Sequence, residues 1–110
     1  MTRKEALQEL VAKVKAGDRT WSLRGTQLKG LGDDVSRAYN GSMDAALSLF
    51  EAVLPRWRVT HMWGGCSDDW KWNVTKGDGP TADYASGQDD KCSRALLIAI
   101  LEALVVMEDG

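Results

Sequence analysis

Histidine, cysteine and proline are scarce in this sequence: His61 is the only histidine, and there are two cysteines and two prolines. Zinc sites are built from sets of Cys and His ligands at characteristic spacings, so this composition argues against a metal centre. Cys66 and Cys92 are also too few for a disulfide scaffold, and we expect free thiols in both. We therefore predict neither a metal nor another cofactor.

The sequence also lacks a long apolar run, a leader-like start and a surplus of cations. Its longest apolar stretch, residues 95–107, contains Glu102 and is shorter than the ~20 residues that a membrane-spanning helix needs. Charged residues interrupt positions 1–15, which argues against a secretory signal and predicts a cytoplasmic protein without membrane contact. The net charge of −2 argues against nucleic acid as a partner.

What is present describes one small globular domain of 110 residues, 44% of them apolar. A chain of this size buries about two thirds of its unfolded surface, enough for a single core. We divide the domain into an N-terminal helix with a basic connector, residues 1–38, and a core, residues 39–107. The connector is rich in glycine but lacks the Lys-Ser/Thr pair of a phosphate-binding loop.

Three helices are predicted, over residues 2–16, 42–54 and 90–106. Thr2 and Glu5 form a capping-box pattern, Ser42 is a suitable N-cap, and Pro55 ends the second helix. The third helix is apolar on nearly every side. We expect it either to form a homo-oligomer interface or to be buried completely between the sheet and the other helices.

Four of the five tryptophans fall between residues 57 and 72, where apolar and polar residues alternate as in strands. The turn at residues 64–69 divides this region, which predicts a β-hairpin, and residues 81–86 are expected to add an edge strand. The residues expected to face the core by strand parity are Trp57, Val59, Trp70, Trp72 and Val74. The predicted class is α+β, with helices covering an antiparallel sheet in layers.

The order of features over residues 39–106 resembles a known family. A helix with the letters D-A-A-L leads into L-P-R-W, tryptophan-rich strands follow, and a final helix begins S-R-A-L-L-I-A at Ser93. This order resembles the phage ABA-sandwich domain family, small proteins of phages and prophages whose function is open. The resemblance implies a three-layer α-β-α sandwich and a phage origin, supplies no catalytic motif, and leaves residues 1–38 outside the family's core.

Tryptophans beside cations favour a binding site, although a small domain also needs its largest side chains in the core. Trp63 precedes a glycine turn and Trp21 lies in the basic connector, so we expect these two to face solvent. The predicted ligand-binding set is Trp63, Trp21, Arg58, Lys71 and His61.

The leading functional hypothesis is a non-enzymatic phage accessory protein that binds a host protein in the host cytoplasm, interferes with a host factor or host defence, and forms a homo-oligomer through its third helix. One alternative is sequestration of a small nucleotide by tryptophan stacking and Arg/Lys charge. A second alternative is a small hydrolase that uses His61 with Cys66 or with Asp68 and Asp69, because a catalytic histidine needs a nucleophile or a carboxylate beside it.

Overall fold

The computed structural model describes residues 2–18, 21–23, 25–26, 28–64, 69–77 and 82–109; for residues 29, 61–63 and 109 it describes the backbone alone. The described part of the chain forms α1 (Arg3–Lys15), η1 (Lys29–Leu31), α2 (Gly32–Tyr39), α3 (Met43–Val53), β1 (Arg58–Gly64), β2 (Trp70–Lys76), β3 (Asp83–Asp89) and α4 (Cys92–Asp109). These elements confirm the α+β class. None of the described helices is long and apolar enough to cross a membrane.

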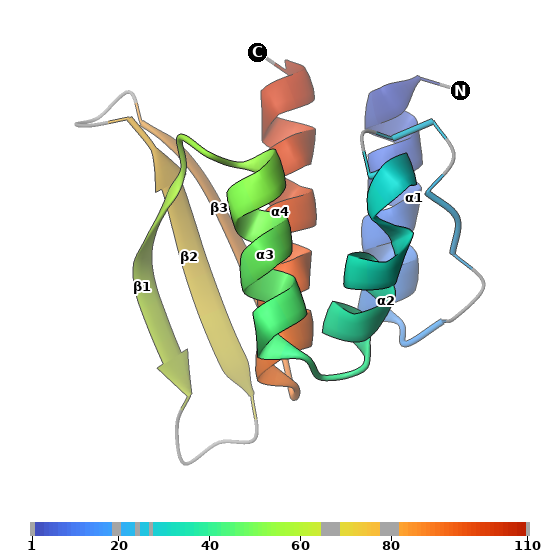
Figure 1. Cartoon of the computed structure of the whole chain (residues 1–110). Helices are drawn as coiled ribbons and strands as arrows, with labels where there is room; N and C mark the ends of the chain where they lie inside the picture. The colour runs from blue at the N-terminus through green and yellow to red at the C-terminus, as the bar shows by residue number, and fades with distance from the viewer. Residues whose placement is uncertain are drawn as a thin grey trace.

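The sheet has the order β1-β2-β3, and both strand pairs are antiparallel. α4 packs against β3 and β2, while α1, α2 and α3 surround the rest of α4. Figure 1 shows the arrangement in layers. The sheet forms one outer layer, α3 and α4 form the middle layer, and α1 and α2 form the outer layer on the opposite side. The antiparallel α+β sandwich is confirmed, with both helical layers on the same side of the sheet rather than one on each side.

α4 is the centre of the core. Its residues 95–101, 103 and 104 are at most 1% exposed within a single chain. The sheet and the other helices therefore cover this apolar surface within one chain. Of the two alternatives predicted for this helix, a homo-oligomer interface or burial inside the domain, the structure shows burial. Two side chains at its start join α4 to α2: Ser93 Oγ donates to Ala38 O at 2.8 Å, and the Arg94 guanidinium donates to Tyr39 O.

Local capping explains where two of the helices begin. Thr2 and Glu5 form both hydrogen bonds of the capping box at the start of α1, and Ser42 Oγ accepts from Ala45 N at the start of α3. α2, in contrast, lies within the segment interpreted as a connector. It is short, and it buries Val35, Ala38 and Tyr39 against α3 and α4.

Gly87 allows α4 to lie directly on β3. A Cβ at this position would overlap the carbonyl oxygen of Ala95 and the amide nitrogen of Ala99, and would lie 3.0 Å from the Cα of Ala99. Every one of these atoms belongs to the helix backbone, so no side-chain rotation relieves the overlap. The close approach also brings Trp72, the β2 partner of Gly87, within reach of the helix, where its Nε1 donates to Cys92 O at 3.1 Å.

The core-facing set of the hairpin is confirmed in part. Trp57, Trp72 and Val74 are buried, whereas the expectation that Val59 and Trp70 face the core is wrong: they are 39% and 37% exposed. β1 lies at the edge of the sheet away from α4, so no helix covers Val59 fully. Trp70 stands at the end of β2, where its indole lies over Gly64, its cross-strand partner.

Candidate functional site

The face of the sheet opposite α4 has no described helix against it, and we call it the helix-free face (Figure 1). Because Trp72, Val74 and Ala85 are buried under the helices, the alternate residues of β2 and β3 belong to the other side. The residues of this face are Lys71, Asn73, Thr75, Tyr84, Ser86 and Gln88, which are half-buried or exposed. They are polar apart from the phenol ring of Tyr84.

A β-bulge determines which residues of β1 join this face. Arg58 pairs with Thr75 and Val59 with Val74, but the register then shifts, so that His61 pairs with Asn73 and Trp63 with Lys71. The bulge leaves Thr60 as the extra residue. The backbone register therefore brings Arg58, His61 and Trp63 opposite residues of the helix-free face. Together with Lys71, these are four of the five predicted ligand-binding residues; the side chains of His61 and Trp63 lie outside the described part of the structure.

Hydrogen bonds order the helix-free face. The Thr60 and Thr75 hydroxyls are 3.0 Å apart, and the Tyr84 hydroxyl donates to Asn73 Oδ1 at 2.9 Å. These bonds hold the phenol ring across β2 and β3 while leaving 54% of Tyr84 exposed. Arg58 is exposed and Lys71 is half-buried. The face thus offers an aromatic ring, an amide and two cations at fixed positions.

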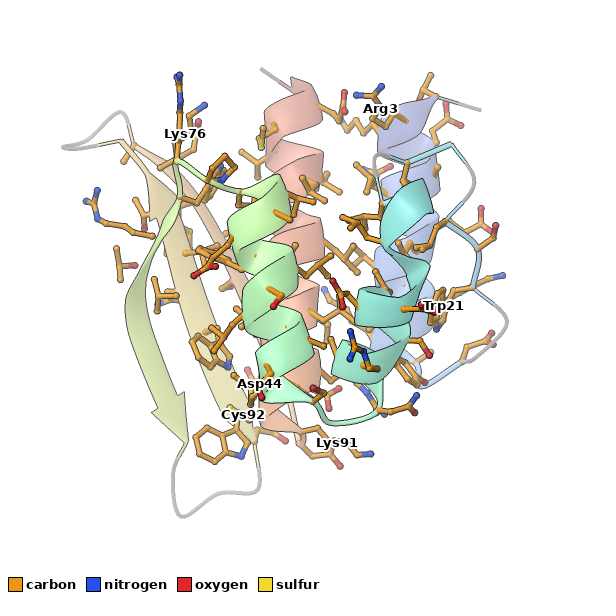
Figure 2. The ribbon with its side chains drawn as sticks, viewed as in Figure 1. Arg3, Trp21, Asp44, Lys76, Lys91 and Cys92 are labelled. Carbon is orange, nitrogen blue, oxygen red and sulfur yellow. The ribbon has the colours of Figure 1, made fainter. Side chains whose placement is uncertain are left out.

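Trp21, the other tryptophan expected to face solvent, is packed against the core instead. Its ring centroid lies 6.1 Å from that of Tyr39, and the two planes are tilted by 54°. The side chain is half-buried, and its Nε1 is buried without an acceptor among the described residues. Figure 2 places it beside α2, away from the sheet. Trp21 therefore does not join the other predicted ligand-binding residues.

The residues of the hydrolase hypothesis are only partly described. Cys66 and Asp68 lie outside the described residues, and of His61 only the backbone is described. Asp69 is exposed, and its Oδ2 accepts from Gln88 Nε2 at 2.9 Å. Within the described part of the chain, no three His, Cys, Asp or Glu residues are grouped so that they could hold a metal ion.

A groove lies on the helix side of β1, between this strand and α3. We call it the α3–β1 groove; its volume is about 450 Å³, and it is lined by Leu47, Phe50, Glu51, Leu54, Pro55, Trp57 and Val59. Leu47 and Val59 are among the most exposed large apolar side chains, at 42% and 39%. The lining residues are apolar except for Glu51.

A smaller cavity of about 110 Å³ adjoins the groove, since Leu54, Pro55 and Trp57 line both hollows. Its other lining residues are Val53, Arg56, Lys76 and Met107. We call it the basic cavity. Trp57 is 6% exposed, and its indole Nε1 is buried without a hydrogen-bond acceptor among the described residues.

Two adjacent carboxyl groups before α4 influence each other. Asp89 Oδ1 accepts from Lys91 N at 3.0 Å and lies 3.9 Å from Arg94 Nη1. Burial raises the pKa of Asp89, and a hydrogen bond that the protonated Asp89 carboxyl group donates to Asp90 contributes in the same direction. The same hydrogen bond lowers the pKa of Asp90. Asp89 therefore binds a proton more readily in the folded chain than in the unfolded chain.

The polar partners on the helix-free face and the α3–β1 groove were not predicted from the sequence. Tyr84 and Ser86 stand in the predicted third strand, and Gln88 just after it continues their spacing of two, a pattern that already indicates a solvent-facing side. The groove and the basic cavity have no comparable signal, because together they join residues 47–59 to Lys76 of β2 and Met107 of α4, which are distant in the sequence.

Comparisons with family models, with curated proteins and with solved structures give no match to this chain. The resemblance to the phage ABA-sandwich domain family thus stays a prediction.

Proposed function

We propose that this chain is a small binding protein that recognises a partner protein with the helix-free face of its sheet. The observation that carries this proposal is the bulge at Thr60, after which His61 and Trp63 pair with Asn73 and Lys71, while Arg58 pairs with Thr75 before it. Residues predicted from the sequence for their ligand chemistry are thus in backbone register with a face that no described helix covers.

The residue types of this face support a protein partner. Interface hot spots are enriched in Trp, Tyr and Arg, because these side chains combine a large contact area with hydrogen-bonding groups. Tyr84 is exposed and is held by its bond to Asn73, so little freedom is lost when a partner covers it. A phage origin, implied by the resemblance, makes a host protein in the host cytoplasm the proposed partner.

A nucleotide is the second candidate ligand. A base stacks on an exposed aromatic ring, and nearby cations neutralise its phosphate. The ring of Tyr84 and the cations Arg58 and Lys71 belong to one face, which is the observation that favours this alternative. This candidate function requires a small-molecule ligand and not a protein partner, so the identity of the bound molecule distinguishes the two candidates.

The test is a comparison of variants in capture from lysate of the source host. Immobilised wild-type protein is expected to retain a defined host protein, and Tyr84→Ala and Lys71→Ala are expected to lower the retained amount about tenfold or more, as for hot-spot residues. Lys91→Ala, which removes an exposed cation outside this face, is the control. Equal capture by all four proteins would refute the role of the face.

The nucleotide candidate is tested on the same proteins by thermal unfolding. A nucleotide that binds the native state raises the Tm of the wild type and of Lys91→Ala but not that of Tyr84→Ala. A nucleotide panel without any rise in Tm excludes this candidate.

A further inference from the structure

We propose that the outer edge of β1 binds an extended peptide segment of another protein, which adds to the sheet as a fourth strand and covers the α3–β1 groove. The contact is made by the backbone of β1 and by the side chains of the groove, and not by the side chains of the helix-free face. It is therefore a binding mode additional to the function proposed above.

The backbone of β1 is open on its outer side. β1 is an edge strand of the sheet, and among the described residues no backbone hydrogen bond outside the sheet and the helices involves residues 59–64. Residues 61–64 keep a regular register with β2 after the bulge, so their outward N–H and C=O groups alternate regularly along the edge. An extended backbone is the partner that matches such a row of donors and acceptors.

The sequence of β1 does little to protect this edge. Natural edge strands are commonly blocked by lysine, by proline or by inward-pointing charges. After Arg58 the strand reads V-T-H-M-W-G, which contains no lysine, proline or acidic residue. The bulge at Thr60 interrupts the edge, but residues 61–64 beyond it stay in register. β3, the other edge strand, begins and ends with an aspartate, so β1 is the edge better suited to accept a strand.

The helix layer is wider than the sheet on the side of β1. α4 lies on β2 and β3, whereas α3 packs on α2 and α4 and makes little contact with any strand. Figure 1 shows α3 beside α4 in the middle layer. Neighbouring helix axes are about 8–10 Å apart and neighbouring strands about 4.8 Å, so two helices cover about four strands. The sheet has three, which leaves the outer side of α3 without a strand beneath it.

The α3–β1 groove is the surface that a fourth strand would cover. Leu47 and Phe50 of α3 line the groove from the helix side, and Val59 of β1 lines it from the sheet side. Leu47 and Val59 are exposed within the single chain. Side chains alternate along a strand, so every second residue of an added strand would point into the groove. Apolar residues at these positions are favoured in proportion to the area that they remove from water.

Charge adds one further requirement. Glu51 is the charged residue of the groove lining; it is exposed and forms no ion pair with another described residue. A lysine or arginine among the groove-facing residues of the occupant would complement Glu51, whereas an acidic residue there would be repelled. The occupant is thus an extended segment that carries apolar residues and a cation at alternate positions.

A second copy of this chain does not meet the same requirements. Because α4 lies over β2 and β3, α3 lies about 10 Å further along the layer, over the outer boundary of β1. If two β1 strands paired about a twofold axis, the α3 helices of both copies would occupy the same place above that boundary. A separate peptide segment brings no helix with it, so it pairs with β1 without this overlap.

The probe is the acetylated and amidated peptide T-V-T-V-T-K-T. Its groove-facing positions are valine or lysine, and threonine and valine favour the extended form. Binding is followed through the backbone ¹H–¹⁵N NMR signals and by hydrogen exchange. The outward amides of residues 59–64 are expected to shift and to exchange more slowly when the peptide is bound, whereas those at the outer edge of β3 stay unchanged.

Two N-methylated peptides test whether the backbones pair. The N–H groups of alternate residues in an extended peptide point to opposite sides, so only one set faces β1. One peptide is methylated at its valines and lysine, and the other at its threonines. One of the two is expected to bind about tenfold or more weakly than the unmodified peptide, and the other about equally. Equal binding of the two methylated peptides would overturn strand addition.

Variants of the groove test the side-chain contacts. Leu47→Gln is expected to raise the dissociation constant of the peptide about fivefold, because it removes apolar surface from the groove. Met107→Gln is the matched control, since Met107 is also 42% exposed but does not line the groove. Glu51→Lys is expected to reverse the charge preference, so that a peptide with glutamate in place of its lysine binds better. Tyr84→Ala is expected to bind the peptide normally, which distinguishes this edge from the helix-free face.

Three further results would contradict the proposal. The first is a peptide that shifts signals of the groove but leaves the amides of residues 59–64 unchanged. The second is an equal effect of Leu47→Gln and Met107→Gln on the dissociation constant. The third is a wild-type chain that is dimeric by light scattering and becomes monomeric in Leu47→Gln, because a second copy would then occupy the edge. Leu47, Glu51 and Met107 are exposed, so these variants are expected to fold.

Discussion

Gly87 is the position where one methyl group is expected to change stability most. In Gly87→Ala the new Cβ overlaps Ala95 O and Ala99 N and lies 3.0 Å from the Cα of Ala99. Relief requires α4 to move away from β3 by about 1 Å, and α4 is the helix on which the other three pack. Overpacking in a core costs about 1–3 kcal/mol, and rigid backbone atoms place this case near the upper end.

The assay is urea unfolding followed by tryptophan fluorescence, with thermal unfolding beside it. A loss of about 3 kcal/mol corresponds to a fall in Tm of roughly 13 °C for a domain of this size. The slope with urea concentration is expected to stay unchanged, because the variant exposes the same surface when it unfolds.

Gly30→Ala is the matched control for this substitution. A Cβ at Gly30 meets nothing within 4 Å, and its φ lies outside the left-handed region. We expect a change within about 0.5 kcal/mol there, as for other surface substitutions. If Gly87→Ala also stayed within that limit, the close approach of α4 to β3 would be refuted.

Three further variants test other contacts. Ser93→Ala removes the 2.8 Å bond to Ala38 O and is expected to cost about 1 kcal/mol in urea unfolding; no loss would mean that this bond does not join α4 to α2. Trp72→Phe loses the bond to Cys92 O and part of a buried ring, so a loss of about 2 kcal/mol is expected, and one below ~0.5 kcal/mol would contradict it. Asp89→Asn tests pH dependence: because the folded pKa of Asp89 is raised above 3.8, the wild type loses stability as pH rises through the interval above that value. Asp89→Asn lacks this loss, so the difference in unfolding free energy between the variant and the wild type is expected to shift in favour of the variant through the same interval and then level off. A difference in unfolding free energy that does not change with pH would contradict the raised pKa.

Elements with strong local signals could be predicted from the sequence. The Thr2–Glu5 capping box and the Ser42 cap act within one helical turn, and the structure shows both. α2 was missed because Gly30 and Gly32 suggest a loop, although Gly32 has φ −57° and begins a helix. The short apolar stripe of α2 stabilises a helix only when α3 and α4 are present to bury it.

The side of β1 on which the predicted site residues lie could not be derived correctly from strand alternation alone. Uninterrupted alternation puts Trp57, Val59, His61 and Trp63 on one side of β1. The bulge shifts the register after Val59, so that His61 and Trp63 pair with residues of the opposite side from Val74. Bulges have a weak sequence signal outside glycine positions, and this one depends on pairing with β2.

The same bulge determines which residues of β1 lie on each side of the sheet. Before it, Val59 lies in the α3–β1 groove; after it, the backbone is in register with the helix-free face. The sheet separates these surfaces, so substitutions on one are expected to leave binding at the other unchanged, and their effects on stability to add. A combined Trp57→Phe and Tyr84→Ala variant should therefore lose partner capture by the amount of Tyr84→Ala alone, and lose stability by the sum of the two single losses. A larger combined loss of either kind would show that the two surfaces are coupled through β1.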